Sequence, residues 1–287
     1  MTAGAGIQFT AETNTVNNPA ATIQTGSTGQ FLGTMTNRGS ITAGGSTTTG
    51  TALHNFGSVA ISAGSLTLQG ALDNHGAINV ASGSMAVDKP HGGGGIFAQY
   101  TGASTTLNGG TGTATATRSI LRAYAAGPGD ADDPATTGTF TLNGNLIVTG
   151  IGSEHSRLEI ELGGTTQGSS YDFFDVNGTA SIDAVIDIRL VNSFQNSISA
   201  SDVFTVLMAD APITGTVRNP WIGGPPGRVI TADGLGSFLL SFSGNNLVLS
   251  GFSTAVPEPA SMAVIAFAGA ATGLARRRPR RRAVSAR

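Results

Sequence analysis

Short runs in which apolar and polar residues alternate recur along almost the whole chain, and Gly, Asn or Ser interrupts them. SVAIS, SLTLQ and SRLEIELGG are examples from different parts of the sequence. Alternation with a period of two is typical of strands with one buried face, whereas an amphipathic helix needs a period near 3.6. Residues 1–255 contain no long segment with the helical period. The pattern therefore predicts an all-β body.

The alternating runs repeat with a nearly constant spacing in the first third of the chain. Three similar segments begin TNRGS, HNFGS and DNHGA, and their asparagines, Asn37, Asn55 and Asn74, are 18 and 19 residues apart. A unit of this length holds two or three short strands and cannot bury its apolar face alone. We interpret residues 1–122 as a parallel β-helix in which each unit forms one turn.

This register assigns structural roles to the repeated positions. The asparagines are expected to form an amide ladder, and Gly39, Gly57 and Gly76 to occupy corners with positive φ. Ile41, Val59 and Ile78 are expected to stack inside the body, and a degenerate earlier copy to start at Asn18.

The same alignment places two pairs of side chains above one another. His54 falls over Asp73, and Phe56 falls over His75. The two histidines therefore do not share a column, which argues against a zinc site.

Beyond the repeats, the chain divides by composition. Residues 123–138, with two prolines and three aspartates, are expected to be a loop or a boundary. Residues 139–252 contain stronger alternating runs and are interpreted as a β-rich continuation or cap of the solenoid. Residues 253–287 differ from everything before them and form a separate tail.

Charge and cysteine content narrow the function classes. Sixteen acidic and eight basic residues precede Glu258, a net charge of −8, whereas one acidic residue and seven arginines follow from Glu258 onward, a net charge of +6. An acidic body argues against nucleic-acid binding. The chain has no cysteine, which excludes disulfides, thiolate metal sites and a cysteine nucleophile.

Candidate catalytic groups are few. Glu159 and Glu161 share one face of a predicted strand, as do Asp183 and Asp187, so these carboxylates are candidates for glycoside hydrolysis or a polysaccharide lyase. Outward positions of an alternating strand are polar by default, however. The three aspartates of GDADDP lack the spacing of a calcium loop. We predict no catalytic residue, no cofactor and no metal, and keep the polysaccharide-active enzyme as the alternative.

The tail combines three features in a fixed order. Val256, Pro257, Glu258 and Pro259 form an extended acidic segment. The apolar run MAVIAFAGAATGLA follows, and a helix over residues 261–278 is expected there. Such a helix is short for a bilayer, but arginine side chains can extend it to the headgroups. The basic cluster Arg276, Arg277 and Arg278 places the C-terminus in the cytoplasm.

This order of VPEP, apolar helix and RRR resembles the PEP-CTERM sorting signal of bacterial envelope proteins. The resemblance implies that Val256, Pro257, Glu258 and Pro259 are recognised by an exosortase-type membrane protease, which removes the tail. The body resembles, more loosely, the β-helical regions of autotransporter-like adhesins. A secretion signal is expected with such a tail, yet MTAGAGIQFTAET has neither a basic nor an apolar run. Either the protein remains inside the cell or its true start lies upstream.

Together these features predict a non-enzymatic structural or adhesive protein, secreted or held in the cell envelope. The tail helix would anchor it transiently in the inner membrane, and exopolysaccharide is the candidate partner of its body.

Overall fold

The computed structural model describes residues 9–11, 15–25, 29–31, 33–49, 52–81, 85–88, 95–107, 110–125, 137–220 and 227–254. Within these ranges the protein is all-β, as predicted, and the 3-10 helix η2 (Phe194–Asn196) is a single short turn. No helix in the described part is long and apolar enough to cross a membrane. The predicted tail helix 261–278, the motif 256–259 and the basic cluster 276–278 lie outside the described residues.

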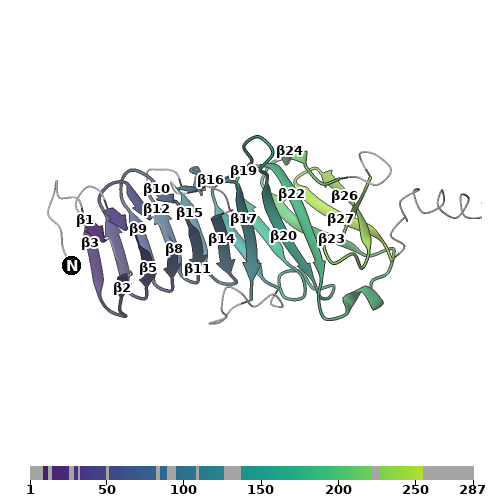
Figure 1. Cartoon of the computed structure of the whole chain (residues 1–287), viewed down its shortest axis with the longest axis horizontal. Helices are drawn as coiled ribbons and strands as arrows, with labels where there is room; N and C mark the ends of the chain where they lie inside the picture. The colour runs from purple at the N-terminus through teal and green to yellow at the C-terminus, as the bar shows by residue number, and fades with distance from the viewer. Residues whose placement is uncertain are drawn as a thin grey trace, which may run out of the picture.

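The strands form three columns, and along most of the chain each strand pairs in parallel with the strand three places further on. The first column contains β2 (Thr15–Asn17), β5 (Thr34–Asn37), β8 (Ala52–Asn55), β11 (Ala71–Asn74), β14 (Gly95–Tyr100), β17 (Ser119–Tyr124) and β20 (Ser156–Leu162). Figure 1 shows this column along the front of an elongated body, from the purple N-terminal end to the green strands.

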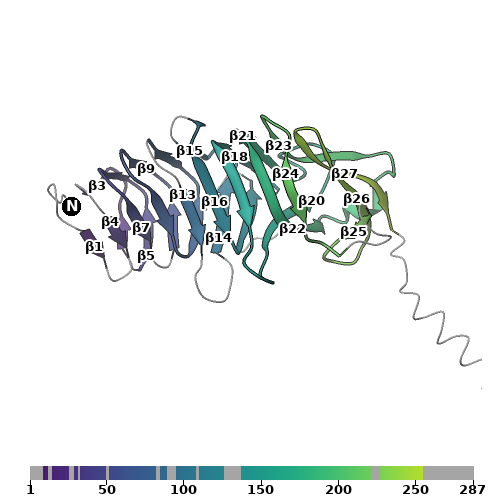
Figure 2. The same ribbon diagram turned by 90° about the horizontal axis from the view of Figure 1, so that it is seen from above.

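The other two columns follow the same rule. The second contains β3 (Thr22–Thr25), β6 (Ser40–Ala43), β9 (Ser58–Ile61), β12 (Ala77–Val80), β15 (Ser104–Leu107), β18 (Thr139–Asn143), β21 (Phe173–Asn177) and β23 (Val203–Ala209). The third contains β1 (Phe9–Ala11), β4 (Gly29–Phe31), β7 (Thr47–Thr49), β10 (Leu66–Leu68), β13 (Met85–Asp88), β16 (Thr113–Thr117) and β19 (Asn145–Thr149). Figure 2 shows the same stacking from above. We call three consecutive strands, one from each column, a rung.

The C-terminal end departs from this pattern. The long strand β22 (Ala180–Leu190) pairs with β19 through its first residues and with β20 through its last seven, so it joins the third column to the first. β24 (Thr214–Val217) adds to β22. The strands β25 (Arg228–Ile230), β26 (Ser237–Ser243) and β27 (Asn246–Ser253) continue the second column beyond β23 with antiparallel pairing.

The strands on both sides of residues 123–138 belong to continuous sheets. β17, which ends at Tyr124, pairs with β14 and β20, and β18, which begins at Thr139, pairs with β15 and β21. The sheets therefore continue on both sides of the expected loop or boundary, of which Ala123 and Tyr124 belong to β17 and Thr137 and Gly138 to no strand. Residues 126–136, which include the aspartates 130, 132 and 133, lie outside the described residues.

The predicted amide ladder is present inside the body, at the corner where the first-column strands β5, β8 and β11 end. Asn37 Nδ2 donates to Asn55 Oδ1 at 2.7 Å, and Asn55 Nδ2 donates to Asn74 Oδ1 at 2.9 Å. The ladder begins one position before the predicted Asn18: Asn17 donates to Asn37 Oδ1 at 2.8 Å, because this rung is 20 residues long rather than 19. Buried amides that satisfy one another fix the register of successive rungs.

The predicted inner column is also confirmed. Ile41, Val59 and Ile78 occupy equivalent positions in β6, β9 and β12 and are almost completely buried. In later rungs phenylalanines pack in the interior: Phe97 meets Phe140 edge to face with ring centroids 4.7 Å apart, and Phe140 lies tilted against Phe174 at 5.2 Å. The apolar residues of the alternating runs thus form one continuous core along the body.

The reason predicted for the repeated glycines is wrong. Gly39, Gly57 and Gly76 do not have positive φ. Their constraint is the close approach of the next rung: a Cβ on Gly57 would lie 2.0 Å from the backbone oxygen of Gly39, and one on Gly76 would lie 2.0 Å from that of Gly57. Only glycine fits because stacked backbones leave no room for a side chain.

Candidate functional site

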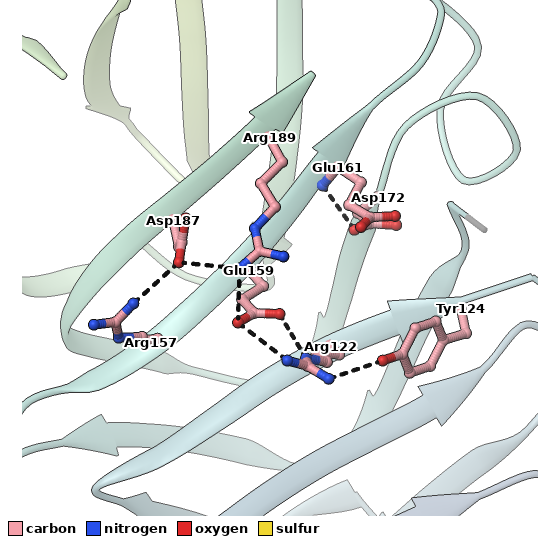
Figure 3. A network of polar contacts seen from close by, with 8 residues as sticks. All are labelled: Arg122, Tyr124, Arg157, Glu159, Glu161, Asp172, Asp187 and Arg189. Carbon is pink, nitrogen blue, oxygen red and sulfur yellow. Dashed lines mark hydrogen bonds and ion pairs between the residues drawn. The ribbon is translucent and has the colours of Figure 1, made fainter. Parts of the chain in front are cut away.

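Charged side chains gather on the outer face of the first column at its C-terminal end (Figure 3). Because side chains alternate along a strand, every second residue of β17, β20 and β22 points away from the core. We call these outward-facing polar side chains, together with Asp172 just before β21, the polar cluster. Its members are Arg122, Tyr124, Arg157, Glu159, Glu161, Asp172, Asp187 and Arg189.

Arg122 and Glu159 form the centre of the polar cluster. Arg122 donates from Nε to Glu159 Oε2 at 2.5 Å and from Nη2 to Oε1 at 3.3 Å, a bidentate pair between β17 and β20. Burial lowers the pKa of Arg122, but the hydrogen bond and the attraction to Glu159 outweigh it and raise that pKa overall. Arg122 Nη1 also donates to the hydroxyl of Tyr124 at 3.2 Å. The pair holds both charges in fixed positions.

Asp172 is the most buried acid of the cluster, with 2% of its surface exposed. The backbone N–H of Gly138 donates to its Oδ1 at 2.9 Å, and that of Glu161 donates to its Oδ2 at 2.8 Å. Burial raises the pKa of Asp172 well above its usual value, and the nearby charges of Glu161 and Glu159 add to this, against the lowering effect of the two N–H donors. The protonated form is therefore favoured more than for an exposed aspartate.

Asp187 and two arginines, Arg157 and Arg189, form the third part of the polar cluster. Arg157 Nη1 donates to Asp187 Oδ2 at 3.2 Å. Arg189 Nη2 lies 3.9 Å from both Asp187 Oδ2 and Glu159 Oε1, so these contacts are ion pairs without hydrogen bonds. The other oxygen of Asp187 is buried and has no hydrogen-bond partner among the described residues.

Two hollows adjoin the polar cluster. The first has a volume of about 210 Å³ and is lined by Tyr124, Glu161, Asp172 and Arg189 together with the Arg122–Glu159 pair. The second has a volume of about 190 Å³, and Arg157, Asp187, Asn219 and Ile230 contribute to its walls. Both hollows are bordered by β20 and β22. Arginines, carboxylates and a tyrosine thus surround space that a small ligand group can enter.

An aromatic column leads along the body to the polar cluster. Phe56 stacks on His75, as predicted, with ring centroids 4.3 Å apart, and His75 stacks on Tyr100 at 3.5 Å. Tyr100 lies 5.0 Å from Tyr124. Because the ring faces cover one another, this column stabilises successive rungs and does not present open faces to a sugar.

The second predicted alignment is also confirmed. His54 Nδ1 and Asp73 Oδ2 are 2.7 Å apart. The hydrogen bond to Asp73 raises the pKa of His54 above its usual value, although burial opposes it.

Three of the four carboxylates named from the sequence come together. Glu159, Glu161 and Asp187 belong to the polar cluster, whereas Asp183 lies on the first half of β22 and forms a bidentate pair with Arg218. That hydrogen bond lowers the pKa of Asp183. Within the described residues, no group of three His, Asp or Glu side chains could hold a metal ion.

Sequence reasoning missed the basic and aromatic members of the site. Arg122 and Tyr124 stand at alternate positions of SILRAY, and Arg189 stands two residues after Asp187, so alternation indicated that each points outward. Nothing in the sequence showed that the strand containing Arg122 lies beside the one containing Glu159, 37 residues away.

A comparison of the chain with protein-family models, with curated proteins and with solved structures found no match in any of the three.

Proposed function

We propose that this chain is a non-enzymatic structural or adhesive protein of the cell envelope or extracellular matrix, with a body built as a parallel β-helix. The observation that carries the proposal is the continuity of side-chain ladders along the rungs. The amides of Asn37, Asn55 and Asn74 form one ladder, and the rings of Phe56, His75 and Tyr100 form another. Such ladders stiffen a stack of rungs along its length, which suits a scaffold.

The polar cluster supports the same proposal. Three arginines of the cluster face its carboxyl groups, and burial raises the pKa of Asp172. A catalytic acid or base needs freedom to exchange protons, whereas Glu159 and Asp187 are held by arginines and Asp172 by two backbone N–H groups. The cluster therefore favours binding over proton transfer.

For the tail we propose the sorting route that its resemblance implies. The protein is exported, its tail helix anchors it in the inner membrane with the C-terminus in the cytoplasm, and an exosortase-type protease cleaves at or near Val256 to Pro259. The order of acidic segment, apolar run and basic cluster supports this proposal.

The test is the intact mass of the chain, fused to a secretion signal, in cells with and without an exosortase-type protease. We expect loss of the arginine-rich end only where the protease is present, and retention of the tail in the Glu258→Ala variant. A secreted protein that keeps its arginines in the presence of the protease contradicts the sorting proposal.

The second candidate function is a polysaccharide lyase or glycoside hydrolase on the same β-helix. One observation favours it: Glu159, Glu161 and Asp187 converge, and the buried Asp172 beside them has a raised pKa, as a general acid requires. The test is mass spectrometry of polysaccharides incubated with the full chain. Shortened products that disappear in the Glu159→Gln and Asp172→Asn variants would establish the enzyme and overturn the non-enzymatic proposal.

A further inference from the structure

Arg189 occupies an unusual position in the polar cluster. Its side chain is 42% exposed and makes no hydrogen bond to a described residue; its contacts are the two ion pairs at 3.9 Å. A guanidinium carries five N–H donors in a planar fork. Two nearly buried carboxylates, Glu159 and Asp187, attract the guanidinium of Arg189 without accepting hydrogen bonds from its N–H groups. Arg189 is therefore positioned by the protein while its N–H groups can serve a ligand.

Acceptors lie beside these donors. Asp187 is 7% exposed, borders the second hollow, and has one carboxylate oxygen without a hydrogen-bond partner among the described residues. Glu161, directly opposite Arg189 in the pairing of β20 with β22, borders the first hollow. That oxygen of Asp187, Oδ1, is itself buried, so a ligand in the second hollow would meet Asp187 at Oδ2, which also accepts from Arg157 Nη1 at 3.2 Å. An acceptor, Asp187, and a donor, Arg189, thus stand two residues apart on β22, and Glu161 lies opposite Arg189 on β20.

The charges around the hollows select an uncharged ligand. An anionic polymer would meet the carboxyl groups of Glu159, Glu161 and Asp172, which border the first hollow. A cationic ligand would meet Arg122 and Arg189 at the same place. A hydroxyl group suits both partners, because it donates to a carboxylate and accepts from a guanidinium at once. Two neighbouring hydroxyls can likewise form paired hydrogen bonds with the planar guanidinium of an arginine or with the two oxygens of a carboxylate.

The distance between the two hollows favours an extended ligand of several linked units over a single small molecule. Val185 and Asp187 border the second hollow, and Arg189 borders the first. Along β22 the stretch from Val185 to Arg189 covers about 13 Å at roughly 3.3 Å per residue. Tyr124 in the first hollow and Ile230 in the second add apolar surface next to the polar groups, which suits a ligand with both hydroxyl and C–H faces.

We propose that the outer face of β20 and β22 binds an uncharged oligosaccharide, with Arg189 contacting it between the two hollows and Glu161 and Asp187 accepting hydrogen bonds from its hydroxyls. This inference rests on the proposed function, for which it names the chemical class that an adhesive body would hold. The sugar is bound and released unchanged, so no bond is formed or broken.

The test is a panel of oligosaccharides bound to the full chain, with neutral hexose chains on one side and uronate chains such as oligoalginate on the other. We expect binding to members of the neutral set and at least a tenfold weaker Kd in the Arg189→Ala variant. The matched control is Arg218→Ala, because Arg218 has a similarly exposed side chain, 41%, and pairs with Asp183 on the same strand outside both hollows. This control is expected to bind like the unaltered protein.

Three outcomes overturn the inference: no neutral chain binds, uronate chains bind better, or Arg189→Ala leaves Kd unchanged. Glu161→Gln serves as the second variant and is expected to weaken binding while the circular dichroism spectrum stays that of a β protein. The mass of the recovered oligosaccharide separates this result from the proposed function. Cleavage would contradict the non-enzymatic role but leave the binding face intact, whereas a sorted protein without sugar binding would contradict this inference alone.

Discussion

Asn37 and Asn55 are joined by a hydrogen bond of 2.7 Å from Nδ2 to Oδ1, although 18 residues separate them in the sequence. Asn55 passes the same bond on to Asn74, and both amides are completely buried. Each amide also donates to a backbone carbonyl of the following rung, that of Ser58 for Asn37 and that of Ala77 for Asn55. The ladder therefore ties side chain and backbone of adjacent rungs together at one corner.

We expect the Asn55→Ala substitution to lower the free energy of unfolding by about 1–3 kcal/mol, because it leaves buried partners in both neighbouring rungs without their hydrogen bonds. The measurement is urea unfolding followed by circular dichroism. Asn79→Ala is the matched control, since Asn79 is exposed on β12, and its effect should stay within about 0.5 kcal/mol. Equal effects of the two substitutions would show that the ladder adds nothing to stability.

The repeated glycines give a second prediction. A Cβ on Gly57 would lie 2.0 Å from the backbone oxygen of Gly39, so Gly57→Ala must push two rungs apart and should cost about 3 kcal/mol. At Gly102 a Cβ meets no atom within 4 Å, but φ is +89°, so Gly102→Ala carries backbone strain alone and should cost about 1 kcal/mol. Thermal unfolding of both variants distinguishes the two causes. Similar losses would show that the close approach of the two backbones at Gly57 costs no more than backbone strain at Gly102.

The Asn55 and Gly57 predictions show which features of the fold could be predicted from the sequence and which could not. The positions of Asn37, Asn55 and Ile41 followed from the spacing of the repeats, because residues one rung apart in such a stack become neighbours. The role of Gly57 did not follow, since the distance between stacked backbones is a property of the folded chain. Alternation is also the same in parallel and antiparallel strands, so the antiparallel pairing of β26 with β27 could not be predicted.

The candidate site was predictable only in part. Glu159 and Glu161 share one strand, and alternation alone placed them on one face. Arg122 joins them from the preceding rung, 37 residues earlier, where the chain no longer keeps the period of 18 or 19 residues. Asp172 lies outside any strand and reaches the cluster through the backbone N–H groups of Gly138 and Glu161. Once the rungs vary in length, the sequence no longer indicates which residues become neighbours.

The pair of His54 and Asp73 predicts a dependence of stability on pH. The hydrogen bond to Asp73 raises the folded-state pKa of His54 above its unfolded value of 6.5, so its contribution to stability is complete below about pH 6.5 and is lost as the pH rises through the folded-state pKa. We expect the urea midpoint to fall over this interval in the unaltered protein and to fall less in His54→Gln. An unchanged pH profile in the variant would assign the dependence to other groups. NMR titration of the His54 ring measures the shift directly.

The last prediction concerns the bidentate pair of Arg122 and Glu159. The side chain of Glu159 is 10% exposed, so Arg122→Met leaves a nearly buried carboxylate without its principal partner, and we expect a loss on the order of 3 kcal/mol in the free energy of unfolding. The double variant Arg122→Met, Glu159→Met removes both charges and should recover most of this loss, because a well-packed apolar pair can replace a buried ion pair. Urea unfolding of the two single variants and the double variant gives the coupling energy. Arg218→Met is the control: its partner Asp183 is much more exposed, and no measurable loss is expected. If the double variant is as unstable as the sum of the single ones, the two residues act independently, and the polar cluster is not organised around this pair.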